Sequence, residues 1–517
     1  MLRITLFSYI LWIYFNFGLA CVPKDYGYGS IVCVCSLSNC TLLGPIEIAK
    51  AGTAKLYESS KDGSRFKTSN FQFSSKPPKD GRLRLEISID RTKRYQEILG
   101  FGGAFTDAAG INILSLPEQL QDQILRGYYS SDGLDYTFGR VPIASCDFST
   151  HVYSYDDVPG DVNLTRFSLT EEDSKLKIPL IHRAQKMQSK SIKLFASPWS
   201  APGWMKNSGN MGGPGILKEE YYQTWAEYFV KFLKSYENNN ISFWGLTIEN
   251  EPSAGFIPFY SFQSMGFTPA TERNFLKNYL VPTLRANHLG PEKIKLIIMD
   301  DQRLFLPFWP LWGLDDKEAR DFVSGIGFHW YWNAISPVKS LDLTHDVFPD
   351  KFLLATEACS GSGIFEKPSV QLGSWKRAED YAHDIIQDLL HWTTGWIDWN
   401  LALNTNGGPN WVKNFVDSPI IVNATSVEFY QQPVYFALAH FSKFLPPGSV
   451  RIDSSMKGIL DWFIEVAAFE RPDKAIVLIL VNRRFFKIDY VLRDNKQGYV
   501  SNSIPAHAIQ TYIWRSE

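Results

Sequence analysis

The feature that most constrains this chain is a pattern repeated between about residue 97 and residue 404. A short apolar run, often rich in β-branched residues, ends in polar or aromatic residues and leads into a loop and an amphipathic stretch. This alternation is typical of parallel strands joined by helices. Eight runs fit it: 98–107, 136–148, 192–199, 243–251, 294–300, 325–331, 352–357 and 396–400. Eight strands over this length favour a closed (β/α)8 TIM barrel over an open doubly wound sheet.

The stretch between the third and fourth runs has the pattern of a helix packed on a sheet. Large apolar side chains recur there at spacings of three and four residues: Trp225, Tyr228, Phe229, Phe232, Leu233 and Tyr236. Such spacing places them on one face of a helix. We therefore expect a helical crossover between these two strands.

The two ends of the chain predict a different kind of structure. After Gly458 the pattern changes to short alternating strands at 461–469, 475–482, 486–493 and 508–514, which indicates antiparallel β-structure. The segments 53–57 and 82–89 alternate in the same way. We expect both chain ends to build one β-sandwich domain beside the barrel.

The first twenty residues have the pattern of a secretory signal peptide. Arg3 precedes an apolar run from Ile4 to Phe17, and Gly18 and Ala20 follow, which predicts removal of residues 1–20. The run is short for a membrane span of about 20 residues. Four potential N-glycosylation sites agree with the secretory route, although chance alone gives several: Asn39, Asn163, Asn240 and Asn423.

Four of the six cysteines lie close together after the predicted cleavage site, at Cys21, Cys33, Cys35 and Cys40. They allow three pairings, of which we favour Cys21–Cys33 with Cys35–Cys40, because a bridge from Cys33 to Cys35 across one residue would be strained. A zinc site is the alternative, but no histidine lies among them and the secretory route is oxidising. We expect the remaining two, Cys146 and Cys359, to be unpaired.

Charge excludes one class of partner. Lys and Arg number 52 against 54 Asp and Glu, a net charge of -2, which provides no general attraction for nucleic acid. The nine histidines are scattered and form no His-Glu-x-x-His motif, so we predict no metal. The 16 Trp residues offer aromatic faces that suit sugars, although most such side chains fill cores.

Two glutamates stand out at the ends of predicted strands. In a TIM barrel the side chains at the carboxyl ends of the strands line the active site. The fourth run ends in Glu249-Asn250-Glu251 and the seventh in Glu357. A carboxylate directly after a buried strand is partly desolvated, which suits it to hold a proton. Either glutamate could instead pair with a barrel lysine or arginine, but two on non-adjacent strands favour a functional pair.

Such a pair is what cleavage of a glycosidic bond requires. One carboxylic acid protonates the leaving oxygen, and the other carboxylate attacks the anomeric carbon or activates water. Carboxyl groups about 5 to 5.5 Å apart give retention of configuration. Strict alternation would put Glu249 on the same face as Glu251 and turn Asn250 away, so spacing alone does not choose between the two glutamates.

Several segments resemble motifs of the glucosylceramidases, members of glycoside hydrolase family 30, and follow the order of that family. The similarity covers nearly the whole mature chain, including the cysteine cluster. The segments are Phe101-Gly102-Gly103-Ala104-Phe105-Thr106-Asp107, Ala144-Ser145-Cys146-Asp147-Phe148-Ser149, Ser197-Pro198-Trp199, Glu249-Asn250-Glu251-Pro252, Phe328-His329-Trp330-Tyr331, Thr356-Glu357-Ala358-Cys359, Asp398-Trp399-Asn400-Leu401-Ala402-Leu403-Asn404 and Gly407-Gly408-Pro409-Asn410-Trp411.

The resemblance implies a role for each site residue. Glu251, in the Asn-Glu-Pro motif, would be the acid/base, and Glu357 the nucleophile, of a retaining β-glucosidase that needs no cofactor. The residues expected to contact glucose hydroxyls are Asp147, Trp199, Asn250, Trp399 and Asn414. Wall residues would be Phe148, Trp204, His329, Tyr331 and Trp332, for each of which core packing is an equal alternative. Arg140, on the second strand, is expected to keep Glu357 ionised.

The resemblance also implies a domain plan, a substrate and a location. A small disulfide-containing β region would comprise residues 21–47 with about 401–432, the β-sandwich 50–95 with 449–517, and the barrel 96–400 with 433–448. The substrate would be glucosylceramide, met at a membrane surface. A saposin-type activator and a lysosomal sorting receptor would be possible partners, and the location would be the lysosome, although secretion stays open.

Two alternatives remain beside this prediction. The first is a retaining glycosidase of the same fold that acts on another β-glycoside, because the fold and the carboxylate pair do not determine the sugar. The second is an inactive carbohydrate or lipid binder. Intact Glu251 and Glu357 argue against the binder, since binding needs neither.

Overall fold

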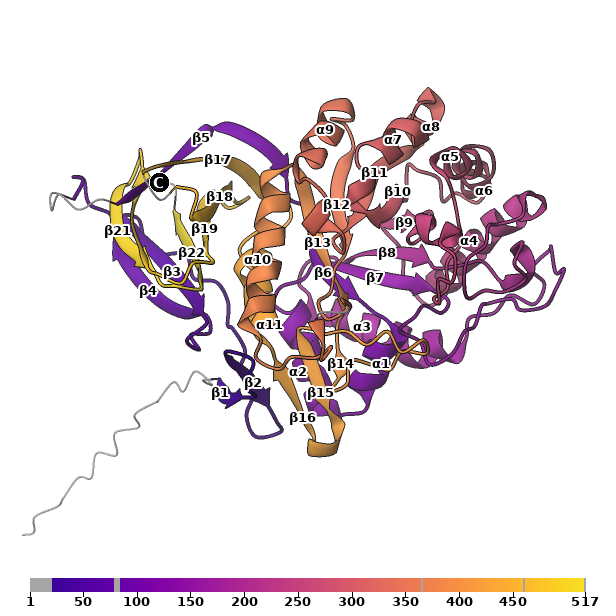
Figure 1. The fold of residues 1–517 in the computed structure, drawn as a ribbon, viewed down its shortest axis with the longest axis horizontal. Helices are drawn as coiled ribbons and strands as arrows, with labels where there is room; N and C mark the ends of the chain where they lie inside the picture. Colours follow the sequence, from indigo (N-terminus) through magenta and orange to yellow (C-terminus); the bar gives the residue numbers. More distant parts are fainter. Residues whose placement is uncertain (1–20, 79–83, 364–365, 459–460, 516–517) are drawn as a thin grey trace, which may run out of the picture.

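The computed structural model describes residues 21–78, 84–363, 366–458 and 461–515. The predicted signal peptide lies outside these ranges. In Figure 1 the barrel and its surrounding helices lie at the right and a curled β domain lies at the left. A small sheet lies below them. In the part of the chain that is described, no helix is both long and apolar enough to cross a membrane.

The eight predicted strands form a closed parallel barrel. Its order around the barrel is β10-β11-β12-β13-β6-β7-β8-β9, and the pairing of β13 with β6 closes it. Large side chains fill the interior, since Phe138, Phe195, Ile297, Leu354 and Ile397 are fully buried in one cluster. The strands are β6 Gly100–Ala104, β7 Phe138–Ile143, β8 Lys193–Pro198, β9 Gly245–Thr247, β10 Lys295–Gln302, β11 Val323–His329, β12 Phe352–Glu357 and β13 Thr393–Asn400.

Helices surround the barrel (Figure 1). The predicted crossover is confirmed as α4, whose six large apolar side chains are all buried. The α-helices are α1 Asp107–Leu114, α2 Glu118–Tyr129, α3 Ile178–Met187, α4 Tyr222–Glu237, α5 Pro269–Phe275, α6 Val281–Ala286, α7 Phe308–Gly313, α8 Lys317–Phe322, α9 Lys339–Val347, α10 Trp375–Leu390 and α11 Pro433–Ser442.

Both chain ends build a nine-stranded sheet, as predicted. Its order is β21-β20-β5-β17-β18-β19-β22-β3-β4, and it curls so that an isolated bridge joins Ser74, beyond β4, to Tyr499 of β21. The expectation of purely antiparallel pairing is wrong at one place, because β20 and β5 are parallel. The strands are β3 Thr53–Ser60, β4 Lys67–Gln72, β5 Leu85–Glu97, β17 Val450–Lys457, β18 Ile464–Glu470, β19 Ala475–Asn482, β20 Ile488–Asp494, β21 Gly498–Ile504 and β22 Ala508–Arg515.

A small sheet lies against the barrel and carries both disulfides. Its order is β1-β2-β16-β15-β14, with β1 Val22–Asp25, β2 Ile31–Cys35, β14 Leu403–Asn404, β15 Ile420–Asn423 and β16 Glu428–Gln431. The predicted pairing is confirmed, with bridges Cys21–Cys33 and Cys35–Cys40. Cys146 and Cys359 are free and buried.

The potential glycosylation sites differ in accessibility. Asn163 and Asn240 are exposed, whereas Asn39 and Asn423 are half-buried. The side-chain amide of Asn423 also donates a hydrogen bond to the Tyr430 hydroxyl at 3.0 Å. Glycosylation of the four sites stays a prediction.

Buried titratable groups make the stability of the fold depend on pH. Burial raises the pKa of Glu272, Asp147 and Asp301 to about 7 each, with the charge of Glu357 adding to the shift at Asp147 and that of Glu251 at Asp301. Burial lowers the pKa of His440, which lies between the barrel and the β domain, to about 3. In unfolded chains carboxyls titrate near pH 4 and histidine near 6.5.

We expect the protein to be more stable at pH 5 than at pH 7. Between about pH 4 and 7 the folded carboxyls hold protons that the unfolded chain has released, so their contribution falls as pH rises through that window. The contribution of His440 to stability is complete above about pH 6.5 and falls with decreasing pH. This opposite trend of one histidine is outweighed by the three carboxyl groups. Glu272→Gln should reduce the difference in unfolding free energy between pH 5 and 7 by about 2 kcal/mol. Denaturant titrations at both pH values measure it, and an unchanged difference would contradict the assignment.

Candidate active site

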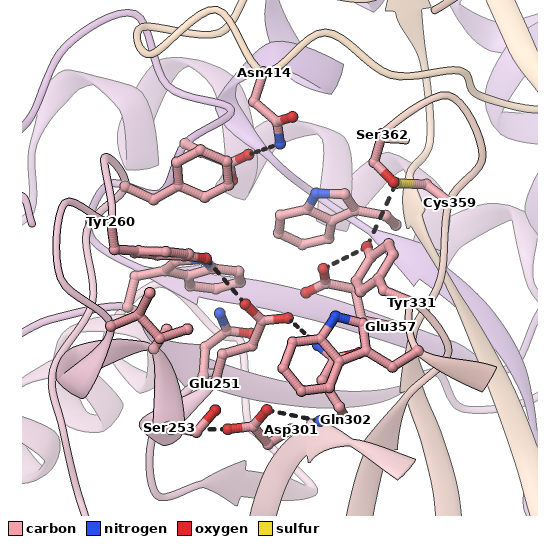
Figure 2. A pocket seen from close by; sticks show the side chains of 18 of the residues that line it. Glu251, Ser253, Tyr260, Asp301, Gln302, Tyr331, Glu357, Cys359, Ser362 and Asn414 are labelled. Atoms are coloured by element: carbon pink, nitrogen blue, oxygen red, sulfur yellow. Dashed lines mark hydrogen bonds between the residues drawn. The ribbon is translucent and has the colours of Figure 1, made fainter. Parts of the chain in front are cut away.

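A cavity of about 270 Å³ lies at the carboxyl ends of the barrel strands (Figure 2). This size is near the lower end for ligand pockets and suits a small polar ligand. The described residues that line it are Asp147, Trp199, Asn250, Glu251, Ser253, Ala254, Ile257, Tyr260, Phe262, Asp301, Gln302, Tyr331, Trp332, Glu357, Cys359, Ser362, Trp399, Asn414 and Val416.

The two predicted glutamates face one another in this cavity. Glu357 is the last residue of β12, and Glu251 follows β9 by a short turn. One carboxylate oxygen of each, together with a ring nitrogen of His329, lies within 4.8 Å of the others. The barrel therefore brings two carboxyl groups from opposite sides to within the reach of one reacting carbon.

Glu357 is held by two groups. The Arg140 guanidinium forms an ion pair with Glu357 Oε2, and the Tyr331 hydroxyl donates to Oε1 at 2.7 Å. Arg140 is fully buried and also pairs with Asp300 at 2.8 Å and donates to Asn250 Oδ1 at 2.8 Å. The contact between Arg140 and Glu357 that the sequence predicts is therefore present.

We expect Arg140→Met to lower kcat/KM by at least about tenfold. Without the guanidinium, the Glu357 carboxylate loses its ion pair and with it the orientation toward the reacting carbon. The variant should also lose about 3–5 kcal/mol of stability, since it leaves the buried Asp300 with His329 as its one charged partner among the described residues. Initial rates and denaturant unfolding measure the two effects. Arg183→Met, which breaks an ion pair with Asp122 on the outer helices, is the matched control and should keep the wild-type rate.

Glu251 is held by three donors that the sequence did not predict as its partners. Gln302 donates to Oε1 at 2.7 Å, the Tyr260 hydroxyl donates to Oε2 at 3.1 Å, and His329 Nδ1 lies 3.0 Å from Oε1. Figure 2 shows Tyr260 and Gln302 beside this carboxylate. Gln302 is the last residue of β10, beyond the predicted end of the fifth strand at residue 300. A prediction with the correct strand end would have placed Gln302 at the site. Tyr260 follows a 3-10 turn (η4, Pro252–Phe256) in an irregular loop, which has no periodic signal.

His329 is a cation in this site. Burial opposes its charge, but Glu357, Asp300 and Glu251 together raise the pKa of His329 to about 10. Both ring nitrogens therefore carry protons, and Nε2 donates to Asp300 Oδ1 at 3.0 Å. Burial would raise the pKa of Asp300, yet Arg140 and His329 hold it well below its usual range.

The contacts of His329 also bear on metal binding. Glu251, His329 and Glu357 form the one group among the described residues with ligand atoms close enough for an ion. Both ring nitrogens of His329 are hydrogen-bonded to carboxylates, and the Arg140 guanidinium already forms an ion pair with Glu357. The donor set therefore fits a proton-transfer site better than a metal centre.

Sugar-like ligands have suitable partners in the same cavity. Trp199 and Trp399 stack with ring centroids 5.1 Å apart, and both line the cavity. Asp147 Oδ2 accepts hydrogen bonds from Asn410 at 3.1 Å and from Asn414 at 3.2 Å. Carboxylate, amide and indole groups of this kind bind hydroxyls and the apolar faces of sugar rings.

Three predicted wall residues lie elsewhere, whereas Tyr331 and Trp332 do line the cavity. Phe148 is fully buried behind the wall, where its ring packs edge-on against Trp399, and His329 stands behind Glu251. Trp204 donates its indole N–H to the Asp156 carbonyl and packs against Tyr221. None of these three side chains lines the cavity.

The expected alternation along the fourth strand is wrong. β9 ends at Thr247, and Glu251 has a left-handed backbone with φ of 46°. The turn brings both Asn250 and Glu251 into the cavity, whereas Glu249 is fully buried outside it. Neither oxygen of Glu249 has a hydrogen-bond partner among the described residues.

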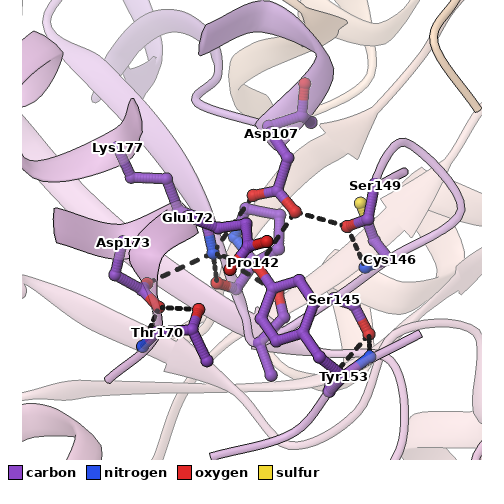
Figure 3. Close-up of polar contacts among 12 residues, drawn as sticks. Asp107, Pro142, Ser145, Cys146, Ser149, Tyr153, Thr170, Glu172, Asp173 and Lys177 are labelled. Atoms are coloured by element: carbon purple, nitrogen blue, oxygen red, sulfur yellow. Dashed lines mark hydrogen bonds and ion pairs between the residues drawn. The ribbon is translucent and has the colours of Figure 1, made fainter. Parts of the chain in front are cut away.

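A buried polar cluster anchors the segment that carries Asp147 (Figure 3). Lys177 Nζ lies 3.4 Å from Asp107 and 3.2 Å from Asp173. Ser149 Oγ donates to Asp107 Oδ2 at 2.5 Å. Burial raises the pKa of Asp107, against the charge of Lys177. The paired charges fix the segment after β7, which holds Asp147 in place.

A TIM barrel with two facing carboxylates and sugar-binding side chains at its strand ends defines the class of glycoside hydrolases. Residues 98–445 match the family model described as "Glycosyl hydrolase family 30 TIM-barrel domain", and residues 448–512 match "Glycosyl hydrolase family 30 beta sandwich domain". The chain belongs to glycosyl hydrolase family 30.

Individual relatives agree with this membership. The chain is 46% identical over 517 residues to "Lysosomal acid glucosylceramidase" of Mus musculus, which covers 99% of this chain and 98% of that protein. The crystal structure of SrfJ from Salmonella typhimurium is similar with a TM-score of 0.82 and 29% identity over 90% of this chain and all of the other. The endo-β1,6-glucanase BT3312, at 24% identity and a TM-score of 0.78 over 90% of this chain and all of the other, has the same fold.

Proposed function

We propose that this enzyme hydrolyses the β-glucosidic bond of glucosylceramide, releasing glucose and ceramide with retention of configuration. The observation that carries the proposal is the approach of Glu251 and Glu357 to within 4.8 Å inside one cavity. Retaining glycosidases place their carboxyl groups about 5 to 5.5 Å apart, whereas inverting enzymes need about 6.5 Å or more to admit a water. The name of the mouse relative supports glucosylceramide as the substrate.

The reaction would take place in two displacements. Glu357 attacks the anomeric carbon while Glu251 gives its proton to the leaving oxygen, so ceramide departs and a glucosyl ester forms on Glu357. Water then attacks the same carbon, Glu251 takes its proton, and the ester bond breaks to release glucose. No cofactor enters either step. Arg140 and Tyr331 hold the attacking carboxylate, and Gln302, His329 and Tyr260 orient the acid.

We also propose how glucose is held. Asp147, Trp199, Asn250, Trp399 and Asn414 would bind its hydroxyls and one face of its ring, because all five line the cavity. The separate β-sandwich and small disulfide-linked β region would support the catalytic barrel from outside.

A mechanism-based glucosyl inhibitor tests the assignment of the nucleophile. A 2-deoxy-2-fluoro-β-glucoside with a good leaving group should react with the enzyme and stop at the glucosyl ester. We expect peptide mass spectrometry to find the label on the peptide with Glu357 and to find none in Glu357→Gln. Label on a peptide that carries another carboxylate would overturn the assignment.

The second candidate function is a retaining glycosidase for another β-glycoside. Comparing hydrolysis of aryl β-glucoside, β-galactoside and β-xyloside separates the two candidates. The proposed function requires the glucoside to have the highest kcat/KM.

The proposed location is the lumen of the lysosome, reached by the secretory route, with the protein working at a membrane surface. The mouse relative is described as lysosomal, and the expected stability at acidic pH suits such a compartment. A saposin-type activator and a sorting receptor belong to the same proposal.

A further inference from the structure

Gln263 lies behind the wall of the catalytic cavity and connects separate segments of the chain. Its side chain is 1% exposed and is not among the residues that line the cavity, although its neighbour Phe262 is. The amide nitrogen donates to Ser145 Oγ at 2.9 Å and to the Cys146 carbonyl at 3.2 Å. The amide oxygen accepts from the Trp411 indole N–H at 2.9 Å. Both ends of this amide are therefore hydrogen-bonded.

The partners of Gln263 require an amide at this position. The Trp411 indole N–H can only donate, and the Cys146 carbonyl can only accept. An ionised glutamate would supply the acceptor without the donor, and methionine would leave both partners without a strong hydrogen bond, which is unfavourable for buried groups. The amide thus joins two groups that belong to different segments of the chain.

The two donated hydrogen bonds reach the segment that carries Asp147. Ser145 is itself fixed, because its hydroxyl donates to the Tyr153 carbonyl at 2.7 Å and accepts from the Tyr153 N–H at 2.9 Å (Figure 3). Cys146 directly precedes Asp147, so the carbonyl that accepts from Gln263 belongs to the peptide bond leading into Asp147. A shift of this peptide would move the Asp147 carboxylate.

The accepted hydrogen bond reaches the segment that carries Asn410 and Asn414. Trp411 directly follows Asn410, and the amides of both asparagines donate to Asp147 Oδ2, at 3.1 and 3.2 Å. The backbone N–H of Trp411 also donates to the Asp147 carbonyl at 3.2 Å. Gln263 therefore joins, from behind, the two segments whose side chains meet at the Asp147 carboxylate.

The backbone around Gln263 is also held in place. Isolated bridges pair Gln263 with Gly212 and Gly213. The buried Lys206 donates from Nζ to the Ser264 carbonyl at 2.7 Å. The amide is thus presented from a fixed backbone, as the support of a binding site requires.

We propose that Gln263 is a positioning residue for the glucosyl group: it fixes Asp147 and Asn414 and does not itself contact the substrate. This inference rests on the proposed function, in which both of these side chains bind glucose hydroxyls. Contacts with ring hydroxyls that exist before as well as during bond cleavage set KM more than kcat. Loss of the amide should therefore weaken binding of the glucosyl group and leave attack by Glu357 largely intact.

Gln263→Met tests this role with a soluble aryl β-glucoside. We expect KM, and the inhibition constant of free glucose, to rise about tenfold, the size expected when one hydrogen bond to a charged group is displaced. The value of kcat should stay within about threefold of wild type. A role in folding alone would lower the unfolding temperature without changing KM of the folded enzyme.

Gln96→Met is the matched control. Gln96 is also buried, and its amide makes three hydrogen bonds, with Arg451 and with the carbonyls of Leu389 and Thr393 at the start of β13. It does not line the cavity, so its replacement should keep the wild-type KM.

Trp411→Phe breaks the same connection from the other side, because it removes the indole N–H that donates to Gln263. It should also raise KM, and it decides alone if Gln263→Met does not fold. The double variant should raise KM no further than the larger single effect. Wild-type KM in the folded single variants, additive rises in the double variant, or an equal rise in Gln96→Met would overturn the proposal. A wild type that prefers a galactoside or a xyloside would instead refute the proposed function, and KM for the preferred glycoside would then decide the role of Gln263.

Discussion

Replacement of Glu357 by glutamine should lower kcat/KM for β-glucosides by at least about a thousandfold, the largest effect we expect from any single substitution. Covalent catalysis depends on a carboxylate that attacks the anomeric carbon. An amide is a poorer nucleophile and does not form the glucosyl ester. The substitution keeps the shape of the side chain and the acceptor for Tyr331. It removes the charge that faces Arg140 but leaves no empty space. The loss of activity should therefore arise from the chemistry.

Initial rates with a soluble aryl β-glucoside measure this effect, with folding checked by thermal unfolding. Glu272→Gln is the matched control, because it alters another buried barrel carboxyl that lies outside the cavity and binds Trp309. The control should keep wild-type kcat. A Glu357→Gln enzyme that turns over within tenfold of wild type would refute the double-displacement mechanism.

Replacement of Glu251 by glutamine should have an effect that depends on the leaving group. For a substrate whose leaving oxygen needs a proton, such as an alkyl glucoside, the rate should fall by about 10²–10⁴-fold. A dinitrophenyl glucoside needs no proton, so its glucosyl group should still transfer to Glu357. Water would then lack its base, and the glucosyl ester should accumulate after a burst of dinitrophenol.

Azide provides the decisive measurement on this variant. Azide attacks without losing a proton, so it should restore turnover of the dinitrophenyl glucoside and give β-glucosyl azide. Glu249→Gln is the matched control two residues away. Burial raises the pKa of Glu249 well above its usual range, and the side chain lies outside the cavity, so its replacement should leave the rates near wild type. If Glu249→Gln showed the burst and the azide rescue instead, the two glutamates would have to exchange roles.

Much of the β domain was predictable, but three of its strands were not. β19 has the predicted bounds, because seven of its eight residues are apolar and all eight are buried. β4 has almost no buried side chain and exists through its pairing with β3. The alternation of β17 and β21 is similarly weak, with mostly half-buried or exposed side chains. Where a strand is stabilised by its neighbour and not by its own apolar face, local sequence carries no signal.

The sequence by itself determined the barrel, the cysteine pairs and the strand-end positions of Glu251 and Glu357, because each follows from local periodicity or from short separations along the chain. Strand periodicity left open which glutamate of the fourth strand enters the cavity; the family resemblance implied Glu251, and only the tertiary structure shows why it is Glu251. The reason is that β9 is three residues long and the backbone turns at Glu251, so alternation ends before the site begins. The contacts of Glu251 with Gln302 and His329 join residues 51 and 78 positions apart, which the neighbouring strands β10 and β11 bring to the site, whereas Tyr260 reaches Glu251 from an irregular loop.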